Sequence, residues 1–253
     1  MTTTEGVRVE MDGSVRRIVL NRPRTLNALT LDDLATLHAA LELPSGVRAV
    51  VFAGTGDRAF CAGMNVDTFL GFDPAGARAF IADLRALLQR VRTLPVPALC
   101  AVDGHCLGAA FELALACDLR IATDRAVFGL PEIKVGIPSV IDAALLQQYV
   151  GLSLAKEMIL TGDGYPVARL AASGLCNAVV APVELEATVE RFVGRVSGHT
   201  RAVTASQKRL FELWQNGTLA EGTAASVEEF ATVFAEPETA AHLAGYRATL
   251  GSR

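Results

Sequence analysis

The chain has 253 residues, of which 51% are apolar and 20% charged, and its formal net charge is −4. A chain of this length can bury roughly three quarters of its unfolded surface, as one main domain with an appendage or as two domains. The slight acidic excess argues against nucleic acids and anionic membranes as general partners. An anionic ligand would have to be bound by local groups.

The five cysteines and four histidines show no spacing typical of a metal site, so we predict no bound metal. The cysteines form no Cys-x-x-Cys pair and lie among apolar residues, which is typical of buried, reduced thiols. Neither a signal-peptide core nor a membrane-length apolar run is present. We therefore expect a cytoplasmic protein that does not enter a membrane.

The N-terminal residues predict a β-hairpin followed by a helix. Apolar and polar residues alternate over 7–11, Asp12 and Gly13 supply the turn, and residues 15–20 return as a strand. After the loop "NRPRTLNALT", Thr30 is a candidate N-cap. The helix that it would begin carries apolar residues at helical spacing, namely Leu31, Leu34, Leu37 and Leu41.

Strands and helices then alternate along the chain. Residues 47–54 ("VRAVVFAG") predict a buried strand, and helical spacing returns over 80–91. The segment 98–104 predicts another strand, 108–118 a short helix and 119–123 a further strand. This alternation favours an α/β fold with parallel connections.

The character of the chain changes after about Ser197, because no strand pattern remains and the residues predict helices. We therefore divide the chain into an α/β core over residues 1–197 and a helical C-terminal region over 198–253. Several apolar residues of that region would need a partner, since a small helical appendage could not bury them alone. They are Leu210, Leu213, Trp214, Phe230 and Phe234.

Two segments place small residues at a junction between a strand and a helix: 59–66 ("AFCAGMNV") and 104–113 ("GHCLGAAFEL"). Small residues allow close approach to the backbone, and the first turn of a helix leaves N–H groups unpaired. Such donors can bind an oxygen that gains negative charge. Each segment alone is more simply explained as a tightly packed turn.

Two glutamates add a possible proton-transfer function. Glu112 is the only charged side chain between Leu107 and Cys117, and Glu132 follows twenty positions later. Alone, Glu112 could reach solvent or pair with an arginine, and Glu132 could pair with Lys134. Together, two carboxylates beside paired N–H donors suit proton transfer at carbons adjacent to a carbonyl group.

These motifs resemble those of the crotonase (enoyl-CoA hydratase/isomerase) superfamily. The matching pieces, in family order, are "NRPRTLNAL", "AFCAGMNV", "AVDGHCLGAAFELALACDLRIAT" and "FGLPEIKVGI". The resemblance is good over about residues 7–180 and looser over the C-terminal helices. It implies an α/β fold, a spiral of repeated ββα units, with 198–253 as a helical trimerisation region.

The resemblance also implies a site for an acyl-coenzyme A thioester, in which coenzyme A belongs to the substrate and no separate cofactor is needed. The N–H groups of Met64 and Ala109 would form the oxyanion hole. Glu112 would activate water and Glu132 would exchange a proton at C2. The expected substrate-binding residues are Leu26, Ala28, Ala62, Asn65, Val66 and Gly108, and the candidates for the phosphates are Arg22, Arg24 and Arg58.

The paired glutamates favour a 2-enoyl-CoA hydratase, assembled as a homotrimer or as a hexamer made of two trimers. The loop after Glu132 reads "GIPSVIDAALL" in place of the glycine-rich sequence common in the family. Δ3–Δ2 enoyl-CoA isomerisation, or another crotonase-type reaction, therefore remains an alternative. A third possibility is an acyl-CoA-binding protein without catalysis.

Overall fold

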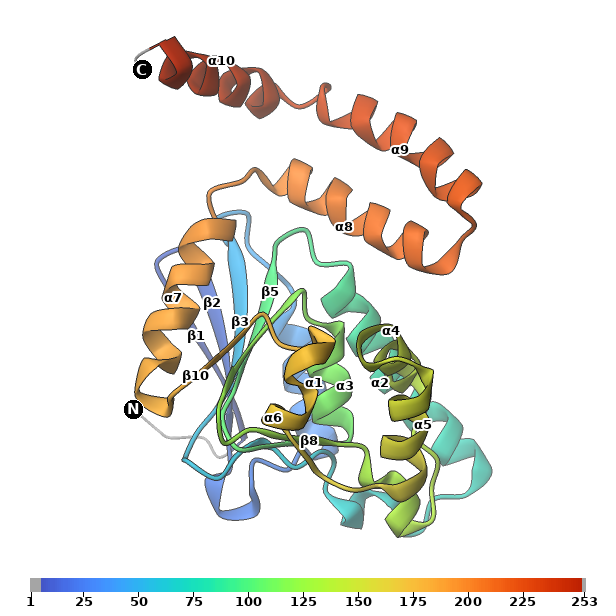
Figure 1. Cartoon of the computed structure of the whole chain (residues 1–253). Helices are drawn as coiled ribbons and strands as arrows, with labels where there is room; N and C mark the ends of the chain where they lie inside the picture. Colours follow the sequence, from blue (N-terminus) through green and yellow to red (C-terminus); the bar gives the residue numbers. More distant parts are fainter. Residues whose placement is uncertain (1–5, 252–253) are drawn as a thin grey trace.

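Two β-sheets form the frame of the protein, whose computed structural model describes residues 6–251 (Figure 1). The larger sheet has the strand order β1-β2-β3-β5-β7-β10, in which β1 and β2 are antiparallel and every other pair is parallel. Its strands are β1 (Gly6–Asp12), β2 (Val15–Asn21), β3 (Ala49–Gly54), β5 (Ala98–Val102), β7 (Leu119–Thr123) and β10 (Ala178–Val180).

The N-terminal hairpin and its following helix agree with the sequence prediction. Asp12 pairs with Val15, so a two-residue connection joins β1 and β2. Thr30 caps α1 (Leu31–Ala40): its side chain accepts a hydrogen bond from the N–H of Asp33, whose carboxylate in turn accepts one from the N–H of Thr30. This reciprocal pairing satisfies two N–H groups and fixes where the helix begins.

The larger sheet is buried on both faces because its strands are apolar at successive positions. Neighbouring residues on a strand point to opposite faces, so Val51 and Phe52 belong to different cores. Val51 packs toward α7 (Leu185–Val196), which covers one face in Figure 1. Phe52 packs into the larger core, which includes residues of α1, α2 (Pro74–Arg92) and α3 (Ala109–Ala116).

A second, smaller sheet was not predicted from the sequence. Its order is β4-β6-β8-β9, and its strands are β4 (Ala59–Cys61), β6 (His105–Leu107), β8 (Val127–Gly129) and β9 (Tyr165–Pro166). β4, β6 and β8 are parallel to one another. Because β4 and β6 are neighbours, the two segments rich in small residues leave this sheet side by side.

The remaining helical segments connect the strands and form the C-terminal region. The 3-10 helices are η1 (Pro23–Thr25), η2 (Val66–Phe69), η3 (Pro131–Val135), η4 (Ile141–Leu145), η5 (Ala171–Ser173) and η6 (Pro182–Glu184). The other α-helices are α4 (Leu146–Val150), α5 (Leu152–Thr161), α6 (Val167–Leu170), α8 (Arg201–Asn216), α9 (Leu219–Val233) and α10 (Pro237–Gly251).

The C-terminal helices lie to one side of the core in Figure 1, with α8 across the core and α9 and α10 beyond it. Lys208 connects α8 to the core: its buried Nζ donates to Asp118 at 2.6 Å and to the carbonyl oxygen of Val91 at 3.2 Å. By contrast, large apolar side chains of α9 and α10 are exposed, including Phe230 at 68% and Tyr246 at 66%.

Four of the five cysteines are buried, as the sequence predicted, and none of the five forms a disulfide. Burial raises the pKa of the Cys61 thiol to about 12. Within residues 6–251, no helix has both the length and the apolar character needed to cross a membrane. The same part of the chain contains no cluster of His, Cys, Asp or Glu suited to a metal ion.

Candidate active site

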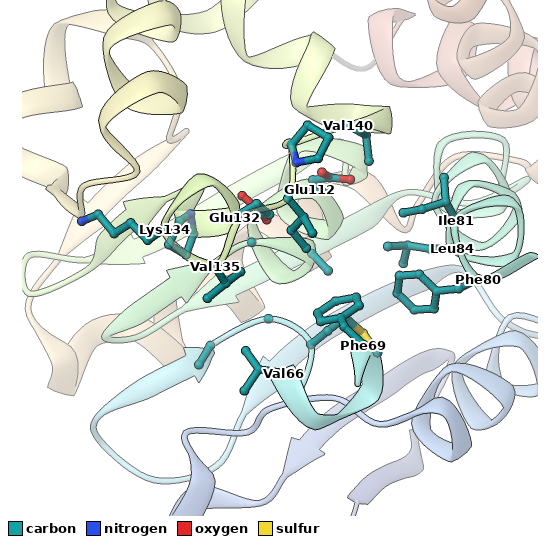
Figure 2. Close-up of a pocket in the computed structure, with 18 residues that line it drawn as sticks. Val66, Phe69, Phe80, Ile81, Leu84, Glu112, Glu132, Lys134, Val135 and Val140 are labelled. Carbon is teal, nitrogen blue, oxygen red and sulfur yellow. The ribbon is translucent and has the colours of Figure 1, made fainter. Parts of the chain in front are cut away.

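A cavity of about 180 Å³ lies where the segments after β4 and β6 meet η3 and the turn before η4. It brings together four residues singled out in the sequence: Met64, Ala109, Glu112 and Glu132. Figure 2 shows the two carboxylates on one side of this cavity and the rings of Phe69 and Phe80 on the other. The other residues that line it are Ala62, Gly63, Val66, Ile81, Leu84, Gly108, Pro131, Lys134, Val135, Ile137, Pro138 and Val140.

Met64 and Ala109 offer two backbone N–H groups at this cavity. Leu29 forms a parallel bridge with Met64, in which the N–H of Leu29 donates to Gly63 and the N–H of Asn65 donates to Leu29. These bonds use the residues on either side, so the N–H of Met64 points away from Leu29. Ala109 is the first residue of α3, where an N–H has no acceptor within the helix.

Two glycines allow these segments to approach each other closely. Gly63 has a φ of +92°, and a Cβ there would lie 2.8 Å from the carbonyl oxygen of Leu107 and 3.5 Å from the nitrogen of Ala109. Gly108 has a φ of +56°, and a Cβ there would lie 2.9 Å from Oε1 of Glu132. Glycine is therefore needed at both positions for backbone conformation and for space.

Glu112 neither reaches solvent nor pairs with an arginine. It lies in the first turn of α3 with 3% of its surface exposed, and its Oε2 accepts no hydrogen bond from any residue that the structure describes. Burial raises the pKa of Glu112 to about 9, and the negative charges of Glu132 and Asp142 act in the same direction. The backbone N–H groups of Asp142 and Val140 oppose this rise only in part.

Glu132 lies on η3 and contacts the loop that follows it. Its Oε2 accepts a 2.6 Å hydrogen bond from the hydroxyl of Ser139, and its Oε1 lies over Gly108. Lys134, the partner considered for Glu132 from the sequence, instead pairs with Asp163 at 2.6 Å. Glu132 therefore remains directed at the cavity.

Sequence reasoning missed the apolar wall of the site. Phe80 and Leu84 of α2 had the spacing of core residues, and nothing in the sequence distinguished them as residues that line a cavity. Phe69 packs edge-on against Phe80, with the ring centroids 5.5 Å apart. This wall suits an apolar acyl group rather than a polar one.

The residues expected to bind the rest of the substrate fall into two groups. Ala62, Val66 and Gly108 line the cavity, whereas Leu26 and Ala28 belong to the neighbouring loop. The two groups are joined by a 2.9 Å hydrogen bond from the N–H of Ala62 to the carbonyl oxygen of Leu26.

Asn65 lies at the start of η2, where its side chain accepts a hydrogen bond from the N–H of Asp67 at 3.1 Å. Of the three candidate arginines, Arg22 pairs with the buried Asp33. Arg58 donates to the carbonyl oxygen of Pro23 at 2.9 Å. Arg24 is exposed and belongs to the same loop region, so Arg24 and Arg58 remain the better placed candidates for phosphate groups.

This arrangement defines a class of site. Two backbone donors can polarise a carbonyl oxygen, and two carboxylates beside them can move protons at the neighbouring carbons. The fold and the site together define an α/β protein whose cavity residues are suited to enolate formation.

Comparison with known proteins agrees with this class. The Enoyl-CoA hydratase/isomerase family model matches residues 10–249, and the chain belongs to this family, which adopts the crotonase fold. A probable enoyl-CoA hydratase from Rhizobium meliloti (strain 1021) is 33% identical over 246 residues, 96% of this chain and 95% of that protein.

Two further relatives show how far the similarity extends. The Enoyl-CoA isomerase/hydratase claC from Penicillium crustosum is 38% identical over 175 residues, 66% of this chain; the match spans only 20% of that longer protein. The crystal structure of a putative enoyl-CoA hydratase from Thermobifida fusca YX, in complex with CoA, superposes with a TM-score of 0.82. It is 29% identical, over 93% of this chain and 95% of the other.

Proposed function

We propose that this protein is a 2-enoyl-CoA hydratase, which adds water across the C2–C3 double bond of an enoyl-CoA thioester. The observation that carries the proposal is the convergence of Glu112 and Glu132 on the cavity that Met64 and Ala109 also line. Hydration requires a base for the water and an acid for the carbon, so it uses both carboxylates.

In the proposed reaction, the thioester oxygen binds between the N–H groups of Met64 and Ala109. The water oxygen bonds to C3, and the electron pair of the double bond moves toward that thioester oxygen to give an enolate. Glu112 takes the proton of the water, and Glu132 supplies a proton to C2, which restores the thioester. The two N–H donors stabilise the negative charge only while it exists, which lowers the barrier.

The protonation state of Glu112 fits the proposed hydration reaction. Because its pKa is raised to about 9, Glu112 holds a proton at neutral pH in the ligand-free protein. One base and one acid are needed, and a pair of carboxylates with a single proton supplies one of each. Under the proposed roles, this proton passes from Glu112 to Glu132 before water is activated.

Δ3–Δ2 isomerisation is the second candidate, favoured by a specific observation at the loop after Glu132. Ser139 donates to Glu132 there, and Val140 lines the cavity, in place of the glycines common in the family. An isomerase moves one proton between C2 and C4, so one carboxylate can suffice. A relative named as both isomerase and hydratase supports keeping this candidate.

The deciding experiment compares hydration of crotonyl-CoA with isomerisation of a 3-enoyl-CoA in the wild type, Glu112→Gln, Glu132→Gln and the double variant. For a hydratase, each single variant loses about 10²–10⁴-fold in kcat. The double variant falls by much less than the product of the two losses, since the residues act as a unit. Glu42→Gln, at an exposed ion pair with Arg90, is the matched control.

Full hydration by Glu112→Gln would show that Glu112 is structural and would overturn the assignment. Turnover of the 3-enoyl-CoA alone, with one glutamate dispensable, would establish the isomerase. Tight acyl-CoA binding without turnover of either substrate would identify a binding protein.

A further inference from the structure

The turn that faces Glu112 has a strained backbone. Ile141 has a φ of +53°, in the left-handed region that β-branched residues rarely adopt. It lies between Val140, which lines the cavity together with Glu112, and Asp142, and the backbone groups of both residues lower the pKa of Glu112. Such a conformation persists only where its surroundings hold it, and it is found preferentially at functional sites.

The side chain that holds this turn is Asp142. Its carboxylate is 6% exposed, and both of its oxygens accept hydrogen bonds from Nη1 of Arg92 at the end of α2. The other side of Arg92 contacts Glu212 of α8, with Nε 3.2 Å from Oε1. Helices α2 and α8 are therefore both tied to the turn through one guanidinium group, whose several N–H donors can serve two carboxylates at once.

We propose that Asp142 and Arg92 form a positioning pair for Glu112: Arg92 fixes Asp142, Asp142 fixes the strained turn, and the turn directs its N–H groups at the carboxyl group of Glu112. Neither residue touches the cavity. Their effect on catalysis rests on the proposed function, but their effect on Glu112 does not.

The pair also acts on Glu112 through charge. The titratable or charged groups near Glu112 on the elements around it are Glu132 and Lys134 of η3, Asp142 of η4, Arg92 of α2 and Glu212 of α8. Lys134 is paired with Asp163, so its charge is largely balanced. The negative charge of Asp142 favours protonated Glu112. Because Arg92 is paired with Asp142, its positive charge opposes that effect.

Because Asp142 and Arg92 carry opposite charges, replacing each of them should shift the pKa of Glu112 in opposite directions. In Asp142→Asn, the negative charge is lost and Arg92 keeps Glu212 as its carboxylate partner, so the pKa of Glu112 falls by about one unit or more. In Arg92→Met, the charge of Asp142 is no longer offset over the alkaline range in which Glu112 titrates, so the pKa of Glu112 rises. Shifts of opposite sign establish the effect of charge, and the loss of kcat/KM in Asp142→Asn reports the positioning of Glu112.

The pKa of Glu112 can be followed without substrate by difference infrared spectroscopy. The C=O stretch of the protonated carboxyl group is assigned by its loss in Glu112→Gln, and is then titrated in the wild type and the variants. Arg92→Lys keeps the charge and should titrate close to the wild type. Arg90→Met, which removes an exposed ion pair from the same helix, is the matched control and should leave the titration unchanged.

Activity supplies the second readout: we expect kcat/KM of Asp142→Asn to fall on the order of 10²-fold because Glu112 is displaced. An unchanged titration in folded Asp142→Asn, or shifts of the same sign in Asp142→Asn and Arg92→Met, would overturn the proposal. Asp142→Asn is isosteric, so the test stands on it even where Arg92→Met fails to fold. If no form of the protein hydrates crotonyl-CoA, the proposed function fails while the infrared result still decides the role of the pair.

Discussion

Two opposing effects act on the pKa of Glu112, and the structure indicates which of them is stronger. The N-terminus of α3 favours a negative charge in its first turn, by an amount that is typically modest. Burial and two neighbouring carboxylates favour the neutral acid, and the pKa is raised to about 9. The apolar surroundings therefore outweigh the helix dipole, and Glu112 stores a proton at neutral pH.

This stored proton predicts the alkaline limb of the pH–rate profile. As the pH rises through about 9, free Glu112 loses its proton and the pair is left without the acid that hydration needs. We expect kcat/KM for crotonyl-CoA to fall over this range. A stopped assay at constant ionic strength measures the profile, with thioester stability monitored separately.

The residual activity of Glu112→Gln should lack this limb, because the group that titrates has been removed. A wild-type rate that stays constant or rises through the same range would contradict the role of Glu112 as the proton store.

At the level of single residues, the sequence indicated the groups with a strong pattern and missed those that act through the fold. Glu112 stood out as a charge in an apolar segment, and Glu132 through its distance from Glu112. The contact of Ser139 with Glu132, and the pairing of Asp142 with Arg92, join residues 7 and 50 positions apart through a loop of irregular conformation. No local pattern encodes such contacts.

Secondary-structure elements explain why the two N–H donors meet. β4 and β6 are adjacent and parallel, so the segments that follow them leave the same edge of the small sheet. Gly63 and Gly108 then allow these segments to touch. The small residues that the sequence displayed are needed for this approach and not merely for tight turns.

Gly108→Ala tests this explanation. The added Cβ would meet Oε1 of Glu132 at 2.9 Å, so Glu132 has to move, and we expect kcat/KM to fall on the order of 10²-fold. Gly151→Ala is the matched control, because Gly151 is also a helix N-cap with a positive φ (+77°) outside the left-handed helical region, but its Cβ would meet nothing within 4 Å. Both variants should lose about 1–3 kcal/mol in unfolding free energy from backbone strain.

Chemical denaturation and steady-state kinetics separate the two effects. Equal losses of activity in the two variants would show that strain alone, and not displacement of Glu132, is responsible.

Whether a helix or strand could be predicted from the sequence depended on how many residues it contains. The long helices and the strands of the larger sheet carried enough residues to show a period, as α2 and β3 illustrate. β4, β6 and β8 have three residues each, too few to reveal alternation. The second sheet, and with it the edge that positions the site, could therefore not be predicted from local sequence.

The whole molecule exposes an apolar surface on its C-terminal helices. Side chains that a globular protein would cover remain accessible there, among them Leu219 at 83%, Phe230 at 68% and Phe234 at 56%. A concentration of large exposed apolar side chains is typical of an interface with another protein. We propose that further copies of the chain cover it, in a trimer or a hexamer.

Static light scattering measures the assembly directly: the wild type should have the mass of three or six chains at micromolar concentration. Phe230→Glu places a charge on the proposed interface and should yield smaller species. Val183→Glu is the control, since Val183 is 91% exposed on the core and lies outside the C-terminal region. A wild type that stays monomeric would contradict the proposal.

The buried cysteines allow the rate of global unfolding to be measured by chemical labelling. A thiol reacts with alkylating reagents as the thiolate, and the pKa of about 12 at Cys61 leaves almost none at neutral pH. Cys61, Cys100, Cys106 and Cys117 come from β4, β5, β6 and the end of α3, so they span both sheets. Labelling of these four with iodoacetamide, followed by mass spectrometry, should therefore proceed only as fast as the whole core unfolds, and the labelling rate becomes a clock for the kinetic stability of the fold.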